Sequence, residues 1–311
     1  VRWVLAPVVD LNTNPRNPVI NVRAFGDDPA AAVRLARATL QGFRTAKVMG
    51  CLKHFPGHGD VAIDSHLDLP RVERTDEAAL RPYRELAGEV EAIMAAHLVA
   101  KDLDEESPVS LSRAAILGFL RGELRFDGLV ATDALDMGGI TKSCTPAEAL
   151  ERAANAGADA LLCPPDALHA AEALEAAVKG GRVAESTIDR AAARVLRAKE
   201  RLGLFADRVT DVASVETVTA STAHRMTAQK IADRAATLVR GSGRVPARVA
   251  LRGAGAPVFE KELRARVEVS DDAEACVVAT AFRPRAFAGV TEMDEAALAP
   301  VKEAVARYKE V

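Results

Sequence analysis

The sequence has little of several features on which common classes of protein depend. Only 4% of its 311 residues are aromatic, no apolar run is long enough to span a bilayer, and no two of its four cysteines form a Cys-x-x-Cys pair. A membrane span, a zinc knuckle and a disulfide framework are therefore not predicted. We expect the cysteines to be small buried hydrophobic residues: Cys51, Cys144, Cys163 and Cys276.

The charge of the chain is also not concentrated anywhere. The net charge is −3, and acidic and basic residues are well mixed, without a basic stripe. Nucleic acid and an anionic membrane are therefore not predicted as partners. The chain opens in a strand pattern (VRWVLAPVVDLN) and stops inside a helical pattern (AVARYKEV), so we expect both ends to be interior to a longer protein. No cellular compartment and no oligomeric state is predicted.

Apolar segments are abundant and regularly spaced. Short apolar runs lie at 3–11, 47–55, 91–99, 127–135 and 158–165, and a helical pattern follows each one. This alternation predicts parallel strands that are buried on both faces. Polar residues end every run, and polar residues at the carboxyl ends of successive strands are typical of a (β/α)₈ barrel of the TIM type. A doubly wound open sheet would concentrate them at one switch point.

The pattern also predicts the domains. Residues 1–205 are predicted as the barrel domain and residues 206–240 as a helical connection. Residues 241–311 are predicted as a partial second α/β domain, with strands at 248–254 and 274–282 and helices at 256–266 and 294–308. No polar motif is concentrated in this second part.

Histidine is scarce, and four of the six histidines lie between positions 54 and 97, most of them in KHFPGHGDVAIDSH. One interpretation is a metal site, with Asp60, Asp64 and His97 completing a set begun by His54 and His58. Pro56 and the neighbouring glycines exclude a helix there, so the usual HxxxH geometry does not apply.

The other interpretation is acid–base catalysis. Asp64 precedes His66 by two residues, a spacing that lets a carboxylate hold the imidazole and stabilise its protonated form. Asp133 directly follows the apolar run GLVAT, where a strand meets its loop. A carboxylate there could attack a sugar C1 and give a covalent intermediate with net retention. Alternatively, Asp133 is a helix N-cap.

These segments resemble glycoside hydrolase family 3, in its β-N-acetylglucosaminidase (β-hexosaminidase) branch. The resemblance spans about residues 3–205 and is carried by KHFPGHGD, DSH, IMAAHL, GLVATDALDMGGI and DRAAARVLRAKERLGLF. Asp-Ser-His is the most specific segment, because relatives acting on glucosides or xylosides usually take their acid/base from a Glu in the second domain.

The resemblance implies a role for each matching residue. Asp133 matches the nucleophile, His66 the acid/base and Asp64 the carboxylate that orients it. Three further residues match positions that bind the sugar: Lys53, His54 and Arg23. Weaker candidates for the pocket are His97, Met137 and Asp10, with His97 expected to support Asp133 or Lys53 by a hydrogen bond. His58 is expected to serve the architecture of the loop.

The implied function is a retaining exo-β-N-acetylglucosaminidase without a metal or organic cofactor, whose partner is a carbohydrate with terminal β-linked GlcNAc. The alternatives are a β-glycoside phosphorylase or other β-glycosidase, a metal-dependent barrel hydrolase, and a non-catalytic sugar-binding barrel. One family segment, Asp-x-Glu-Gly-Gly-Arg, is absent from the sequence, which implies that the first two barrel strands are missing. We therefore expect this polypeptide alone to fold poorly and to be nearly inactive.

Overall fold

The computed structural model describes residues 2–207, 209, 211–219, 221–237, 246–253, 257–279 and 295–308. It divides the chain into two compact units. The first is Val1–Ala206, and the second contains the described residues from Asp207 on. The first unit carries every residue of the predicted site.

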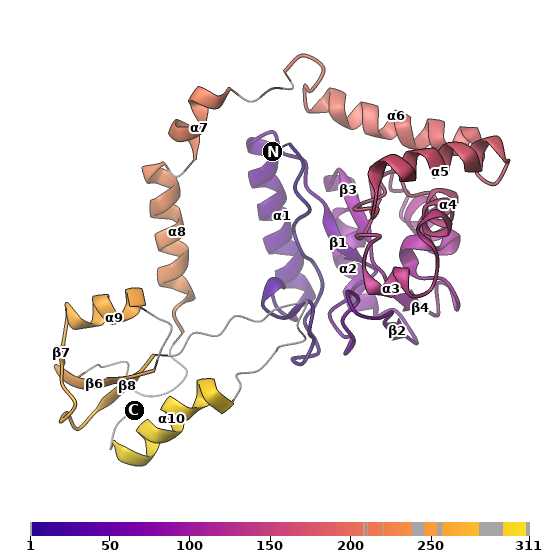
Figure 1. Ribbon diagram of the computed structural model, residues 1–311. Helices are drawn as coiled ribbons and strands as arrows, with labels where there is room; N and C mark the ends of the chain where they lie inside the picture. Colours follow the sequence, from indigo (N-terminus) through magenta and orange to yellow (C-terminus); the bar gives the residue numbers. More distant parts are fainter. Residues whose placement is uncertain are drawn as a thin grey trace. The chain divides into compact units, whose positions relative to one another are not determined.

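Parallel strands in sequential order form the centre of the first unit (Figure 1). β1 (Leu52–Phe55) pairs with β3 (Ala92–Ala95), and β3 pairs with β5 (Leu129–Thr132). Parallel bridges extend this array at both sides, from Trp3 and Val8 to the β1 segment and from Ala131 to Ala160. Each segment therefore neighbours the next in sequence, as in a barrel, without the reversal of order of a doubly wound sheet.

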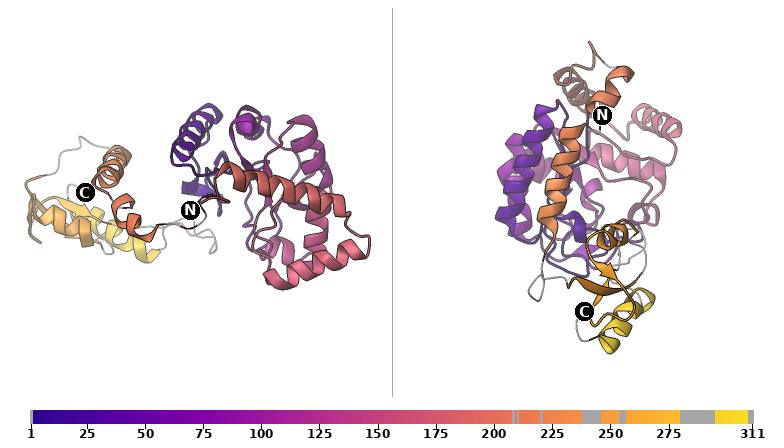
Figure 2. Two further views of the ribbon diagram at one scale, coloured as in Figure 1. Left: turned by 90° about the horizontal axis from the view of Figure 1, so that it is seen from above. Right: turned by 90° about the vertical axis from the view of Figure 1, so that its left-hand side faces the viewer.

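The helices of this unit follow the strands along the chain and can be viewed from two further sides in Figure 2. They are α1 (Pro29–Thr45), α2 (Glu77–Leu86), the π-helix η4 (Ala114–Glu123), α3 (Gly138–Thr141), α4 (Pro146–Ala156), α5 (Ala167–Lys179) and α6 (Glu185–Arg201). Short 3-10 helices are η1 (Asn21–Arg23), η2 (Ala87–Glu89) and η3 (Val109–Leu111). Local sequence sets several of the ends: α4 starts with a Thr145–Glu148 capping box and ends at Gly157 in the left-handed region.

The strands are buried on both faces, as their apolar character predicts. In β3, Ile93 and Ala95 belong to the core beneath α1, α2 and η4, whereas Ala92 and Met94 belong to a second cluster on the other face. That second cluster is covered in part by Val195 and Ala198 of α6 and by Leu202, which directly follows this helix. Successive side chains of a strand point to opposite faces, so this alternation fixes which residues line which core.

A cavity of about 270 Å³ lies at the amino ends of the strands. Residues before β1, β3 and β5 line it, together with α6, and its charged residues are Arg44, Lys47, Glu91, Asp127, Arg194, Arg197 and Arg201. It is at the opposite end of the strands from Asp133, which follows β5. The chemistry discussed below therefore does not use this cavity.

A separate two-stranded pair connects the segments that follow two of the central strands. β2 (Arg71–Val72) pairs in parallel with β4 (Val99–Ala100), joining the segment after β1 to the segment after β3. Neither strand was expected from the sequence. Two residues are too few to show the alternation of apolar and polar residues typical of a strand, so the sequence could not predict this pair.

The second unit has its own small core. β7 (Glu268–Val269), β6 (Arg248–Arg252) and β8 (Cys276–Val278) form a parallel sheet in that order, with α9 (Pro257–Arg264) and α10 (Glu295–Arg307). Ala250, Cys276, Ala304 and Tyr308 pack together there. α7 (Val212–Val218) and α8 (Thr222–Ala235) precede the sheet.

Most predicted elements occur, with narrower bounds. The runs at 47–55, 91–99 and 127–135 each contain a strand of four residues, whereas the runs at 3–11 and 158–165 form only isolated parallel bridges, at Trp3, Val8 and Ala160. The predicted helical connection at 206–240 contains two helices, separated between Val218 and Thr222. Parts of the predicted elements fall on residues outside the described ones, namely 208, 210, 220, 238–245, 254, 256, 280–282 and 294. Cys51 and Cys276 are buried as expected, but Cys144 is half-buried and Cys163 is exposed, because Cys163 lies in the irregular segment between the bridge at Ala160 and α5.

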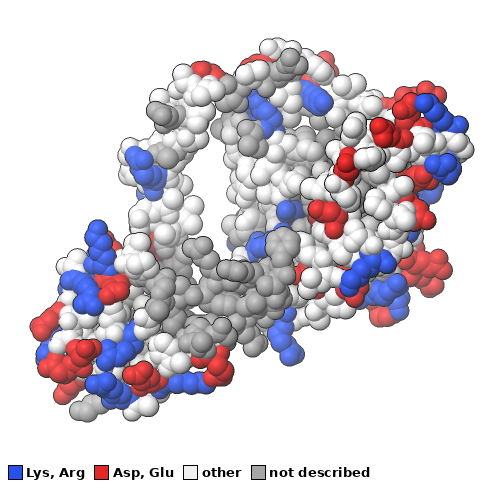
Figure 3. Space-filling view, viewed as in Figure 1, with Lys and Arg blue, Asp and Glu red and all other residues white. Residues whose placement is uncertain are grey.

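The surface of the described part agrees with the mixed charge of the sequence. On the face in Figure 3, Lys and Arg lie interspersed with Asp and Glu. Among the described helices, none is long and apolar enough to cross a membrane.

Candidate active site

Asp133 lies where β5 ends. Its backbone N–H donates to the carbonyl of Ala95 in β3, 2.9 Å away, and its carboxylate Oδ1 accepts from the backbone N–H of Ala134 at 2.8 Å. The first contact continues the β3–β5 ladder, and the second holds the carboxylate beside its own backbone. The predicted nucleophile is therefore fixed at the carboxyl end of the sheet.

Lys53 and His54 are consecutive in β1, yet both act electrostatically on Asp133. In a regular strand they would point to opposite faces. The pairing of β1 with β3 shifts register between Leu52 and Phe55, and such an irregularity re-aims the side chains next to it. This local departure from a regular strand explains how both residues come to serve one end of the barrel.

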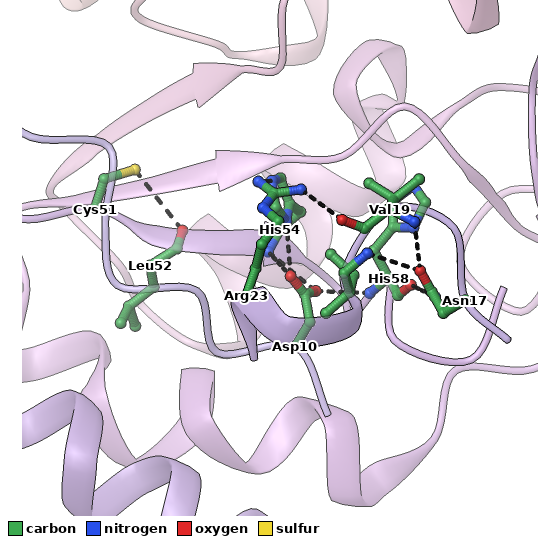
Figure 4. A network of polar contacts seen from close by, with 9 residues as sticks. Asp10, Asn17, Val19, Arg23, Cys51, Leu52, His54 and His58 are labelled. Carbon is green, nitrogen blue, oxygen red and sulfur yellow. Dashed lines mark hydrogen bonds and ion pairs between the residues drawn. The ribbon is translucent and has the colours of Figure 1, made fainter. Parts of the chain in front are cut away.

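His54 is held by Asp10, which is itself 1% exposed (Figure 4). The ring Nδ1 lies 2.7 Å from Asp10 Oδ2, and the backbone N–H of His54 donates to the same carboxylate. Nε2 faces the guanidinium of Arg23 at 3.5 Å. Because a guanidinium only donates, Nε2 accepts, and the proton of His54 lies on Nδ1, towards Asp10.

Asp10 was predicted among the substrate-binding residues, and the structure gives it another position. Its carboxylate Oδ1 also accepts from the backbone N–H of His58 at 2.7 Å, so its oxygens are already engaged within the protein. Burial raises the pKa of Asp10, but His54 and His58 together lower it by more. The pKa of Asp10 therefore lies below its ordinary value, and the group is an ionised carboxylate. Asp10 organises the loop that begins with His54.

Asp64 and His66 form the predicted pair. The ring Nδ1 of His66 lies 2.7 Å from Asp64 Oδ1, and the backbone N–H of His66 donates to the same oxygen at 2.9 Å. Asp64 is buried, whereas the side chain of His66 is 20% exposed. Since an ionised carboxylate only accepts, Nδ1 carries a proton and Nε2 is the nitrogen at which His66 can give and take one.

His97 is the buried histidine on which His54, His66 and Asp133 all act electrostatically. Its ring is fully buried, with Nε2–H donating to the carbonyl of Ala134 at 2.9 Å and Nδ1 accepting from the hydroxyl of Ser110 at 2.7 Å. Both nitrogens are thus used within the protein, so the structure places His97 as a support for the loop after Asp133, not at a sugar-contacting surface. Burial lowers its pKa, Asp133 opposes this, and His54 and His66 act in the same direction as burial.

His54, His66 and Asp133 all act electrostatically on His97, so these three predicted residues surround one buried ring. The carboxylate of Asp133 sits among cationic and polar neighbours: burial raises its pKa, and His54, His97, the Ala134 amide and Lys53 together lower it below the ordinary value. Asp133 is therefore ionised near neutral pH, as a nucleophile must be.

Lys53 is the one predicted sugar-binding residue whose charged group has no hydrogen-bond or ion-pair partner among the described residues. Burial and the nearby Arg23 lower its pKa, whereas Asp133 raises it. The ammonium of Lys53 therefore lies near both the guanidinium of Arg23 and the carboxylate of Asp133. Such donors can bind hydroxyl groups directionally.

Met137 is buried and is the residue that directly precedes α3. Within the described ranges, no three His, Cys, Asp or Glu side chains are grouped so that they could hold a metal ion. The metal-site interpretation of the histidine cluster thus has no ligand set among these residues.

Sequence reasoning missed Asn17. Its side-chain N–H donates to the carbonyl of His58 at 2.7 Å, and its Oδ1 accepts from the backbone N–H groups of Val19 and Ile20. This buried amide shapes the loop that carries Arg23. The signal was the dipeptide Asn17-Pro18, because asparagine side chains hydrogen-bond backbone two residues on in turns.

The fold and the site together define an α/β barrel of TIM type, with carboxylates, histidines and cationic side chains at the carboxyl end of its strands. The model of the glycosyl hydrolase family 3 N-terminal domain matches residues 1–198. The chain belongs to this family, and the predicted family and barrel fold are confirmed.

Known proteins give the extent of the similarity. "Beta-hexosaminidase A" of Pseudoalteromonas piscicida is 40% identical over 176 residues, which cover 51% of this chain and 29% of that protein. A family 3 β-N-acetylglucosaminidase from Paenibacillus sp. str. FPU-7 has a TM-score of 0.80 at 30% identity, covering 100% of this chain and 61% of that one. The β-glucoside phosphorylase BglX bound to 2FGlc has a TM-score of 0.80 at 29% identity, covering 98% and 58%. The chain spans less than two thirds of each.

Proposed function

We propose that the protein containing this chain is a retaining exo-β-N-acetylglucosaminidase. Its substrates are terminal β-linked GlcNAc units, as in cell-wall fragments or chitooligosaccharides. The observation that carries the proposal is the hydrogen-bonded Asp64–His66 pair, which can supply an acid/base at the end of the barrel that also carries an ionised Asp133. The relatives named beta-hexosaminidase support the same substrate class.

The proposed reaction has two displacements. In the first, the Asp133 carboxylate attacks the anomeric carbon while protonated His66 gives its Nε2 proton to the glycosidic oxygen, so the C–O bond breaks and the aglycone leaves as an alcohol. In the second, neutral His66 takes a proton from water as the water oxygen attacks the same carbon. This releases the sugar with retained configuration and restores both the carboxylate and the imidazolium.

The other residues have supporting roles in this proposal. Lys53 and Arg23 donate to sugar hydroxyls and hold the ring for attack, and His54 completes the pocket wall. Asp64 keeps the proton of His66 on Nδ1 and stabilises its positive ring. His97 fixes the Ala134 carbonyl and so the loop that begins at Asp133.

The test is turnover of aryl β-GlcNAc glycosides by the full-length protein and two variants. Asp133→Ala should lose about 10³-fold or more with every aglycone, because the nucleophile is required whatever group leaves. His66→Ala should lose about 10²- to 10⁴-fold in kcat/KM with a poor leaving group and little with 2,4-dinitrophenol, which departs without protonation. Activity that survives Asp133→Ala, or is lost on chelation of metals, would contradict the proposal.

A second candidate is a phosphorylase of the same specificity or of β-glucosides. One observation favours it, the similarity to the β-glucoside phosphorylase BglX. The proposed mechanism adds an argument, because its acid/base is a neutral histidine in the second step. A neutral imidazole places no negative charge beside an incoming phosphate, which could then take the place of water. Inorganic phosphate should in that case increase turnover and give a sugar 1-phosphate; finding neither assigns the site to hydrolysis.

A further inference from the structure

We propose that Gly138 and Gly139 are positioning residues that dock the loop carrying His66 onto the segment after Asp133. The inference deepens the proposed function and rests on it for the role of His66. Its own basis is a set of backbone contacts between residues 65–68 and the first two residues of α3.

Two hydrogen bonds join the segments. The backbone N–H of Gly138 donates to the carbonyl of His66, and that of Gly139 donates to the carbonyl of Ser65, each at 3.0 Å. The first bond ends on the acid/base residue itself. On the other side, Gly138 is only five positions after Asp133, so the two reacting side chains are joined through a short path of backbone.

The absence of side chains at both positions makes this approach possible. A Cβ added at Gly138 would lie 2.7 Å from the carbonyl oxygens of both His66 and Leu67, and one at Gly139 would lie 2.9 Å from that of Ser65. These are backbone atoms, which cannot turn aside as the end of a flexible side chain can. Any side chain at Gly138 therefore has to displace the loop.

The loop is folded tightly enough to transmit such a displacement. The backbone N–H groups of Leu67 and Asp68 both donate to the carbonyl of Asp64 at 2.9 Å. Asp64, His66 and the residues between them thus move as one short turn. Pushing the turn away from Gly138 moves the Asp64–His66 pair relative to Asp133, and general acid catalysis depends steeply on that placement.

The glycines are not explained by backbone conformation. Neither has a positive φ, so helix propensity alone would favour alanine at both positions. Gly42, inside α1, is the matched control, because a Cβ there meets no atom within 4 Å. Alanine at Gly42 tests helix propensity without the loop.

The experiment compares Gly138→Ala and Gly42→Ala in the full-length protein, with kcat/KM for a poor and an activated β-GlcNAc glycoside. Gly138→Ala should lower kcat/KM about tenfold or more with the poor leaving group and far less with 2,4-dinitrophenyl, since only the former needs the acid. Gly42→Ala should leave both unchanged. An equal fall on both substrates, or no fall, overturns the proposal.

Hydrogen exchange provides a readout that does not depend on activity. Amides in a fragment covering residues 61–70 should exchange faster in Gly138→Ala than in wild type or Gly42→Ala; equal exchange overturns the docking contact. If Gly138→Ala does not fold, Gly139→Ala, with its milder 2.9 Å contact, takes its place. A wild-type protein inactive on every β-GlcNAc substrate refutes the proposed function, while the exchange data still decide the contact.

Discussion

Replacement of Asp10 by asparagine is expected to destabilise the protein by about 2.5–6 kcal/mol. The asparagine keeps one oxygen for the backbone N–H of His58 but turns an N–H₂ group towards His54 Nδ1, whose N–H donates to Asp10 Oδ2 at 2.7 Å in the wild type. The lost charge-assisted bond accounts for about 1.5–3 kcal/mol, and the buried donor left unpaired for about 1–3 kcal/mol more. Such a loss is a large fraction of the stability of an ordinary domain.

A change of tautomer does not rescue this variant. With its proton on Nε2, His54 could accept from the new amide at Nδ1, but Nε2–H would then point at the guanidinium of Arg23, 3.5 Å away. One of the two contacts therefore has to fail. Turnover should fall together with stability, because His54 and Arg23 share the wall of the proposed sugar pocket.

Equilibrium unfolding in urea, at pH 7 and below pH 4, measures both the size and the sign of the effect. The pKa of Asp10 is lowered in the folded protein, so its contribution is present above the unfolded value of about 3.9 and is lost as pH falls through the folded value. The difference between wild type and Asp10→Asn should therefore shrink in acid. The control is Asp60→Asn, at an exposed position in the same loop. A cost below about 0.5 kcal/mol at pH 7 would refute this account of the buried carboxylate.

Three further outcomes follow from contacts of the same loops. Asp64→Asn should lower kcat about 10- to 100-fold with poor leaving groups, because it removes the equivalent of one charge-assisted hydrogen bond to His66. Asp68→Asn, exposed on the same loop, should leave kcat unchanged, and equal losses in the two variants would contradict the pairing of Asp64 with His66. Gly59→Ala should cost about 3 kcal/mol or more in urea unfolding, because its Cβ would fall within 1.6 Å of a backbone oxygen, and retention of full stability would contradict this close approach. Burial lowers the pKa of His58 from 6.5 to about 4. Between these two values the unfolded chain binds a proton that the folded protein does not, so the free energy of unfolding should fall by about 1.4 kcal/mol for each unit by which the pH decreases. His58→Phe should remove that dependence, and an unchanged slope would point to another group.

The order of the strands and the position of the site could be predicted from the sequence. Runs of apolar residues with polar ends repeat often enough that pairing of successive strands follows from burial alone, and Asp133 directly follows one of them. The contact of Asp64 with His66 was also within reach, because two residues of extended or turning backbone can bring them together. What these residues do to a substrate stays a prediction.

Other features of the site depend on packing between distant segments, which a single sequence does not display. The register shift in β1 arises in pairing with β3, and it decides that Lys53 and His54 serve the same end of the strand. Asp10 has the same residue type whether it faces a sugar or lies beneath His54. Its 1% exposure comes from the loop around His58, 48 positions away.

The two backbone bonds from Gly138 and Gly139 bear on how this scaffold could be redesigned. A designer who wishes to change the acid would transplant residues 60–69 from one barrel to another, since the whole Asp64–His66 unit lies in that segment. The receiving protein would need small residues at the two docking positions as well, although they lie about 70 positions further along the chain. A graft made without them would carry the right side chains on a loop that cannot form its backbone contacts with the segment after Asp133.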